Sequence, residues 1–258
     1  MILRFLFLLS VAICSSFPCV HAQTLASDPQ GVTILTQSLQ TSGAVNVQSF
    51  TADGTITFFG AGEKVQGPAT IRARGHDQFR LDASLSSGTR SIAVSRDSGS
   101  RKEADGKSTE IPAHNRMSTV VFSFPYPAIA AALRDPTVTI SYIGFVETGG
   151  RKFHQVQTIR NLPKESDPDG TLARLSRTDY FVDGQTYLVT KTTDFTHPVE
   201  TLTEEYPREM ELEGYTAMSG VAVPTTVRQK INGQTIWEFR VSNITFNTNL
   251  SDADFSLQ

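Results

Sequence analysis

Apolar and polar residues alternate with a period of two through most of the chain from Val47 onward. The clearest alternating pairs are Ile56 and Phe58, Ile71 and Ala73, Phe79 and Leu81, and Ile92 and Val94. Glycines between these runs supply turn signals. A period of two places one set of side chains on a buried face and the other in water. The pattern therefore predicts an antiparallel meander with one wet face.

A helical period precedes these strands. Asp28 can cap a helix, and Pro29 suits the first helical position. Three apolar residues then recur at spacings of three and four: Val32, Leu35 and Leu39. Because Gly43 follows soon after, we predict a first helix from Asp28 to Leu39 that ends at this glycine.

The alternation breaks between Ile111 and Leu133, where the chain is apolar without a period of two. The run from Phe124 to Pro127 contains two prolines, which bend or end a helix. We therefore predict two helical pieces, Met117 to Phe122 and Ala128 to Leu133. Their combined length suits a crossing over one face of the sheet.

Strand patterns resume after the crossing. They are predicted at 138–142, from Phe153 after the Gly149-Gly150 turn, at 180–182 and 186–191 around the Asp183-Gly184 turn, at 201–212, and in a last hairpin at 220–246. A polar loop at 161–170 and a terminal turn at 250–255 complete the chain. With about ten or more strands and two helical segments, the fold class is α+β and mostly β, a large curved sheet covered by helical segments.

The last hairpin has a strongly apolar side. If Asn232-Gly233 forms a two-residue turn, strict alternation places Trp237 and Phe239 on one face. Glu238 and Arg240 then point to water. We predict that Trp237 is mostly buried and faces the helical crossing.

The first 22 residues have the features of a cleaved signal peptide. Arg4 supplies the positive start, Phe5 to Ile13 the short apolar core, and Val20 to Ala22 a small-x-small cleavage site. The mature chain, residues 23–258, is expected to be one domain and to be soluble. Its expected location is the periplasm or the exterior of the cell.

Both cysteines, Cys14 and Cys19, lie within this signal. The residues before them, Ile13 and Pro18, are not the small residues that a lipid-attachment site requires. We therefore expect neither lipidation nor disulfides, so packing alone must hold the mature chain together.

The composition offers little for chemistry. A net charge of −3 without a basic stripe argues against a nucleic-acid partner. The mature histidines are dispersed, at His76, His114, His154 and His197. No metal, no cofactor and no catalytic residue is therefore expected, and G-x-S-x-G and S-x-x-K are both missing. Glu209, Glu211 and Glu213 alternate with apolar residues and are interpreted as the wet face of a strand.

An apolar sheet of this width cannot be covered by two short helices, so a cleft lined by apolar side chains is predicted, and such clefts bind apolar ligands. The residues predicted to line this hydrophobic cavity or its mouth are aromatic: Phe58, Phe79, Phe122, Phe124, Trp237 and Phe239.

The C-terminal region carries a longer motif. Its parts are Tyr215-x-x-x-x-Gly220-Val221-x-Val223-Pro224-Thr225-Thr226-Val227, then Asn232-Gly233, then Asn247-x-x-Leu250-x-Asp252-x-Asp254-Phe255. With the order of helix, meander, crossing and hairpins, this motif resembles the periplasmic lipoprotein-sorting carriers of the LolA-like superfamily. The resemblance implies an incomplete antiparallel β-barrel, a helical lid and a cavity for acyl chains. Members carry lipidated proteins or lipids between bacterial membranes.

The favoured hypothesis is a secreted or periplasmic carrier, not an enzyme, that binds an acyl chain or a lipidated ligand between sheet and lid. Its expected partners are a lipid or an acylated protein, with transient membrane contact, and it is expected to act as a monomer. Two alternatives stay open: a structural or protein-interaction module of the cell envelope, and a hydrolase whose catalytic residues converge from distant strands.

Overall fold

The computed structural model describes residues 26–60, 62–95, 97–119 and 124–257, so the predicted signal peptide and Phe122 lie outside the described residues. The helices are α1 (Pro29–Ser42), α2 (Ala113–Thr119), α3 (Tyr126–Ala132), α4 (Thr171–Leu175) and the 3₁₀ helix η1 (Asp252–Phe255). None of the helices in this part of the chain combines the length and the hydropathy that a membrane span requires.

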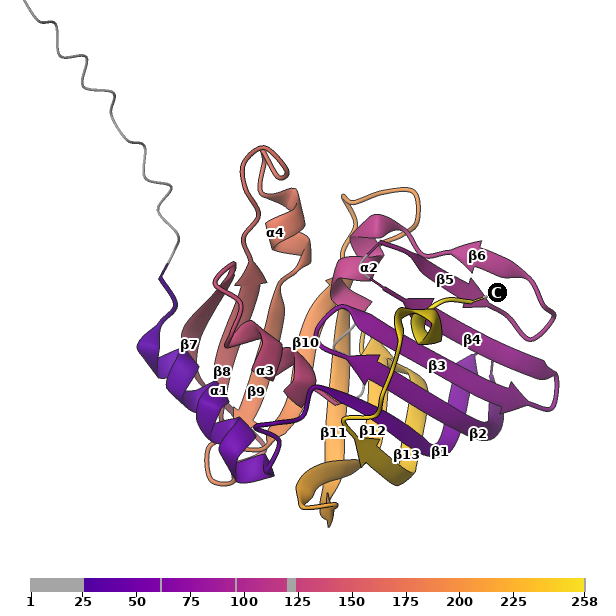
Figure 1. Cartoon of the computed structure of the whole chain (residues 1–258), viewed down its shortest axis with the longest axis horizontal. Helices are drawn as coiled ribbons and strands as arrows, with labels where there is room; N and C mark the ends of the chain where they lie inside the picture. The colour runs from indigo at the N-terminus through magenta and orange to yellow at the C-terminus, as the bar shows by residue number, and fades with distance from the viewer. Residues whose placement is uncertain (1–25, 61, 96, 120–123, 258) are drawn as a thin grey trace, which may run out of the picture.

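The strands form one antiparallel sheet (Figure 1). They are β1 (Ser49–Gly60), β2 (Glu63–Arg74), β3 (Gln78–Leu85), β4 (Gly88–Val94), β5 (Gly99–Lys102), β6 (Ser108–Glu110), β7 (Val138–Thr148), β8 (Arg151–Arg160), β9 (Thr178–Asp183), β10 (Val189–Thr196), β11 (Tyr206–Met218), β12 (Val221–Ile231) and β13 (Gln234–Phe246).

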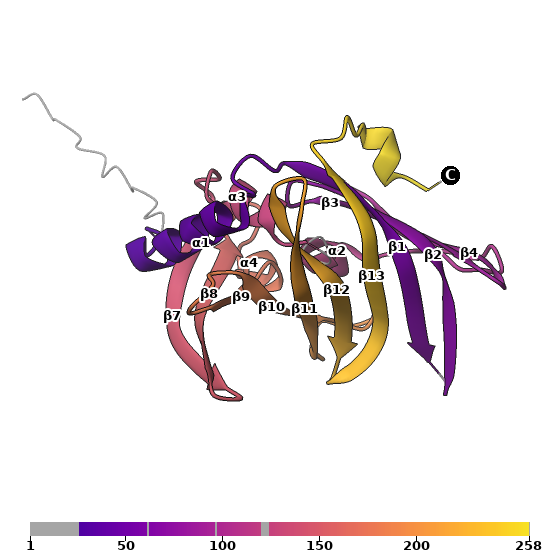
Figure 2. The ribbon, with the colours of Figure 1, turned by 90° about the horizontal axis from the view of Figure 1, so that it is seen from below.

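The order of the strands is that of two meanders joined side by side. The chain runs outward from β1 to β6, crosses through α2 and α3, and returns from β7 to β13, which pairs with β1. Within the described residues β6 and β7 are therefore the two edges, and the sheet is curved but not closed (Figure 2). The predicted fold class, a mostly β incomplete barrel with helical cover, is confirmed.

The first helix follows its prediction. The Asp28 side chain accepts a hydrogen bond from the Gln30 backbone N–H, Pro29 opens the helix, and Gly43 ends it in the left-handed conformation. Leu35 and Leu39 are buried, and the helix packs on β7 and β8. The helix runs to Ser42, three residues beyond the last apolar residue of the predicted face, because the left-handed cap at Gly43 terminates it, as predicted.

The crossing begins earlier than predicted at both of its helical pieces. Helix α2 starts at Ala113 because the carbonyl of Pro112 accepts backbone hydrogen bonds from Asn115 and Arg116. Helix α3 starts at Tyr126, since Pro127 fits the first turn, where no N–H partner is needed. The predicted helix at 117–122 overlaps α2 at 117–119, and its remainder lies outside the described residues.

Helix α4 was not predicted within or after the polar loop. The Asp167 carboxylate accepts hydrogen bonds from the backbone N–H groups of Leu172 and Ala173, at 2.9 and 2.8 Å. A carboxylate that binds free N–H groups at a helix start stabilises even one turn. The aspartate-rich turn at 167–170 therefore begins a short helix.

The predicted strand at 186–191 begins only at Val189. The Asp183 side chain binds the backbone N–H groups of Gln185 and Thr186, and Tyr187 has a positive φ of 55°. These contacts make a five-residue turn where two residues were predicted. The predicted strand at 201–212 likewise lies later, as β11.

The two-residue turn and the burial predicted for the last hairpin are confirmed, and the prediction that Trp237 faces the helical crossing stays a prediction. Trp237 is 6% exposed and Phe239 is fully buried, while Glu238 binds Arg228 and Arg240 on the outer face. Further along β13 the set of inward-facing residues shifts by one position, so that Ile244 is buried. A bulge opposite Asp53 and Gly54 causes this change of phase.

Gly54 is required by this bulge. A Cβ placed there would lie 2.0 Å from the carbonyl oxygen of Arg240 and 2.9 Å from Cζ of Phe239. Gly54→Ala is therefore expected to lower the free energy of unfolding by ~1–3 kcal/mol, the usual cost of overpacking. Urea denaturation measures this loss. Gly60→Ala, on the same strand with nothing within 4 Å of its Cβ, is the matched control, and equal stability of both variants would contradict the assigned role.

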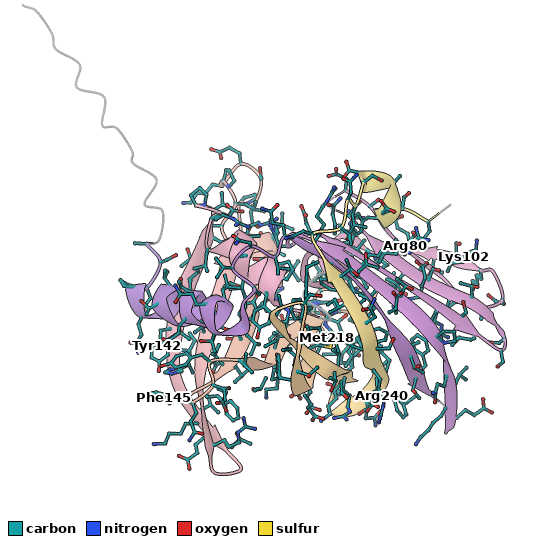
Figure 3. The ribbon with its side chains drawn as sticks, turned by 60° about the horizontal axis from the view of Figure 1, so that its bottom comes forward. Arg80, Lys102, Tyr142, Phe145, Met218 and Arg240 are labelled. Atoms are coloured by element: carbon teal, nitrogen blue, oxygen red, sulfur yellow. The ribbon has the colours of Figure 1, made fainter. Side chains whose placement is uncertain are left out.

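The outer face of the sheet is polar, and the C-terminal segment covers one part of it. Glu209, Glu211 and Glu213 point outward, and Glu211 binds Arg228 and Lys230, which confirms the wet face predicted for this strand. The predicted terminal turn forms η1, whose Phe255 is buried. Arg80, labelled in Figure 3, donates to the carbonyl of Ser256 at 2.9 Å.

Candidate functional site

Two of the predicted cavity residues meet in the core. Phe124, which connects α2 to α3, and Phe239 of β13 line the same small void with Phe50. The ring of Phe124 also contacts Phe50 edge-on, with 5.5 Å between ring centroids. The void measures only about 10 Å³, roughly the room for one water molecule. Side chains therefore fill this part of the core in the conformation described.

The other predicted residues lie nearby. Phe79 is 2% exposed in β3, and Phe58 of β1 is the cross-strand partner of Trp237. Phe58 is half-buried, with the Arg90 guanidinium 4.6 Å from its ring centroid. The sheet thus brings Phe58 and Trp237 together. Their role in ligand binding stays a prediction, as does that of Phe79, Phe124 and Phe239.

A larger cavity, of about 320 Å³, lies where α2, α3 and α4 meet β7, β8 and β9. Its apolar lining comes from Ala113, Ala128, Ala132, Val138, Leu162 and Leu172. Its polar lining comes from His76, Asp77, Ser95, Arg116, Thr158, Arg160, Ser176, Thr178 and Tyr180. The cavity therefore combines an apolar surface with a few polar and charged groups, the usual composition of a small-molecule site.

None of the five predicted residues that the structure describes lines this cavity. It depends on α4, which was not predicted, and on the β2–β3 turn at His76 and Asp77, which lies far from β8 in sequence. One feature of the sequence could have indicated this cavity. Val156, Thr158 and Arg160 alternate on the inner face of β8, which places a guanidinium beside buried apolar residues.

Tyr180 forms part of the inner wall of the cavity. It is 2% exposed, and burial raises its pKa well above the usual value of a tyrosine. Its hydroxyl is therefore neutral at every physiological pH and can donate a hydrogen bond. The site presents a neutral donor at its wall and guanidinium groups elsewhere on its lining.

A buried ion pair lies on the strands next to this wall. Arg208 of β11 binds Asp194 of β10 through two hydrogen bonds, of 2.7 and 2.5 Å. Their side chains are 7% and 8% exposed. Burial raises the pKa of Asp194, and the neighbouring guanidinium offsets part of this effect. The inner face of the sheet at β9–β11 thus carries charged side chains, whereas its inner face at β1–β4 is apolar.

The fold also brings together two histidines that are distant in sequence. The rings of His114 and His197 are 6.1 Å apart between centroids, and Nε2 of His114 lies 3.1 Å from the carbonyl oxygen of Pro198. Burial lowers the pKa of His197, and the charges of His114, Arg174 and Arg208 lower it further. Across the described ranges, no group of three or more histidine or acidic side chains is placed to hold a metal ion.

Comparison with known proteins identifies the fold. No protein-family model matches the sequence, and no curated protein matches it either. Among solved structures, a domain from Vibrio parahaemolyticus described as an outer membrane lipoprotein-sorting protein aligns with a TM-score of 0.54 and 10% identity. The alignment covers 88% of this chain and 96% of that one.

Two further structures give the same result. The LolA superfamily protein NE2245 from Nitrosomonas europaea has a TM-score of 0.52 at 9% identity, over 86% of this chain and 97% of that one. A DUF1329 family protein from Desulfovibrio piger has a TM-score of 0.54 at 12% identity, over 88% and 96%. The chain has the LolA-like fold, and the resemblance inferred from the C-terminal motif is confirmed at the level of the fold.

Proposed function

We propose that this protein is a non-catalytic carrier that binds an acyl chain or a lipidated ligand between its curved sheet and its helices. The 320 Å³ cavity under α2, α3 and α4 is the observation that carries the proposal. Proteins of the same fold include one described as a lipoprotein-sorting domain, which supports the same ligand class. The proposal places the mature chain, from Gln23 on, in the periplasm or outside the cell, as a monomer in transient contact with membranes.

Desolvation would supply the affinity. The apolar lining is made of small and branched side chains, such as Ala128, Val138 and Leu172, which leave room for a flexible chain. Each methylene buried contributes ~0.8 kcal/mol, so several methylenes suffice for binding without a covalent bond. A volume of about 320 Å³ is near the lower end of ordinary ligand pockets. A single acyl chain therefore suits the cavity better than a bulky double-chain lipid.

The helices that cover the cavity are attached in different ways: α3 packs in the core, with Tyr126 and Ile129 fully buried, whereas α2 is held by hydrogen bonds. Asn115 of α2 donates to the carbonyl of His197 at 2.8 Å and accepts from the His197 N–H at 3.0 Å. These hydrogen bonds hold α2 to the end of β10.

Uptake of a fluorescent fatty acid by delipidated protein tests the proposal. We expect saturable binding at about one chain per protein, and a matching added mass by native mass spectrometry. Substitution of Ala132 by Trp, which would fill the cavity from α3, should abolish uptake while circular dichroism stays unchanged. Absence of uptake by the folded wild-type protein would contradict the carrier function.

A structural or protein-interaction module of the cell envelope is the second candidate. The filled core around Phe124 and Phe239 favours it, because a void of about 10 Å³ holds no ligand. Under this alternative the protein binds no lipid at any concentration at which it stays folded.

A further inference from the structure

The cavity lining carries two guanidinium groups. Arg160 ends β8 on the inner face, two residues beyond Thr158. Its side chain makes no hydrogen bond and no ion pair within the described part of the chain. Asp135 senses its charge, but the carboxylate of Asp135 is already bound by the N–H and hydroxyl of Thr137. Arg160 is thus a cation on the cavity wall without a bound anion.

Arg116 is the second cation. Its side chain is only 17% exposed, yet its contacts are long: 3.5 Å to the carbonyl oxygen of Ile111 and 3.5 Å to Glu110, whose own side chain is 82% exposed. Gly99 makes room for it, because a Cβ there would lie 2.9 Å from Cδ of Arg116. A largely buried guanidinium with such weak partners gains strongly from a better anion.

The other charged groups on the lining do not neutralise the positive charge of Arg116 and Arg160. Asp77 is the carboxylate among the lining residues described, against two guanidinium groups. A cationic head group would be repelled by Arg116 and Arg160. A neutral one would leave Arg160 without an anion and Arg116 with only its 3.5 Å contact to Glu110. The apolar surface from α3, β7 and Leu172 lies in the same cavity, so the anion must be attached to an apolar chain.

We infer that the ligand is a single-chain amphiphile with an oxyanion head group, a carboxylate or a phosphate. The head group binds Arg160 and Arg116, and the chain lies on Ala128, Ala132 and Val138. A guanidinium fork binds both kinds of oxyanion in the same way. This inference rests on the proposed carrier function and names the chemical class of its ligand.

The test compares ligands with one chain and different heads: dodecanoate, dodecyl phosphate and dodecanol, each displacing an uncharged fluorescent dye from delipidated protein. We expect both anions to bind about tenfold to hundredfold more tightly than dodecanol, the usual effect of a charge-assisted hydrogen bond. The two anions distinguish a fatty acid from a phosphate lipid. Inorganic phosphate lacks the apolar chain. It should therefore not displace the dye, even at the concentration used in a buffer.

Arg160→Gln should reduce the affinity for the anions about tenfold and leave the affinity for dodecanol unchanged. Arg160→Lys should restore part of the loss, since it keeps the charge and loses the fork. Arg134→Gln removes an exposed arginine at the end of α3 and serves as the matched control. Melting temperatures of all variants exclude misfolding as the cause.

Equal affinity of wild-type protein for all three ligands would overturn the head-group inference and leave the carrier function intact. Failure of all three to bind would overturn both. Loss of dodecanol binding in folded Arg160→Gln, to the same degree as the anions, would show that Arg160 shapes the cavity and does not bind a head group.

Discussion

Replacing Phe239 with alanine is expected to lower the free energy of unfolding by ~3–5 kcal/mol, the usual cost of deleting a buried aromatic ring. Phe239 is fully buried, and its ring contributes to the wall of the small void beside Phe124. Its neighbours belong to the β1 and β12 ladders, which cannot collapse onto the space left by the ring. The cost should therefore lie near the upper end of the range.

Urea denaturation followed by the emission of Trp237, the single tryptophan of the chain, measures this change. Phe145→Ala is the matched control, because Phe145 is also a strand phenylalanine but is 60% exposed (Figure 3). Its substitution should change stability by less than ~0.5 kcal/mol. A similar loss in both variants would show that burial does not distinguish the two rings.

Arg208→Ala is expected to cost a comparable ~3–5 kcal/mol, for an electrostatic reason. The substitution leaves the Asp194 carboxylate buried without the guanidinium that binds it. Burial already raises the pKa of Asp194, and loss of the guanidinium raises it further. Since the folded variant then favours the protonated acid, its stability is greatest below the pKa of the unfolded aspartate. That stability falls as the pH rises through the raised folded value.

Thermal unfolding between pH 3 and pH 8 checks both the size and the sign of this effect. The deficit of Arg208→Ala should narrow toward acid pH. The double variant Asp194→Leu with Arg208→Met, which removes both charges, should recover most of the loss. Arg228→Ala, which removes an outer-face arginine 25% exposed, is the control and should cost at most about 1 kcal/mol. A deficit independent of pH would contradict an uncompensated Asp194.

The alternation of residues predicted most of the strands, because a half-buried sheet imposes a period of two on the sequence itself. It did not predict β5 and β6, which at four and three residues are too short to show a period. Trp237 and Phe239 were placed on the inner face for this reason, and both are buried. Local hydrogen bonds explain what was missed. The side chain of Asp167 starts α4, and that of Asp183 lengthens the following turn. Such bonds depend on one side chain and leave no periodic signal.

The site was harder to predict than the fold. Apolar alternation shows which side chains face inward, but it does not show whether other side chains fill the space between them. Phe124 and Phe239 face inward and pack against Phe50 and its neighbours, so little space is left there. The open space lies instead beneath α4 and beside Arg160, where segments distant in sequence meet. Only the tertiary arrangement brings these segments together.

The pairing of β1 with β13 also bears on how the chain folds. The side chain of Asn247, just after β13, binds Asn46 and Gln48, about 200 residues away in sequence. All other strand neighbours are consecutive, so each meander can form from local hairpins, whereas this ladder must wait for the last strand. Until then the edge of β1 is free to pair with other chains. Aggregation during refolding should therefore begin at β1, and a peptide that copies β13 should suppress it.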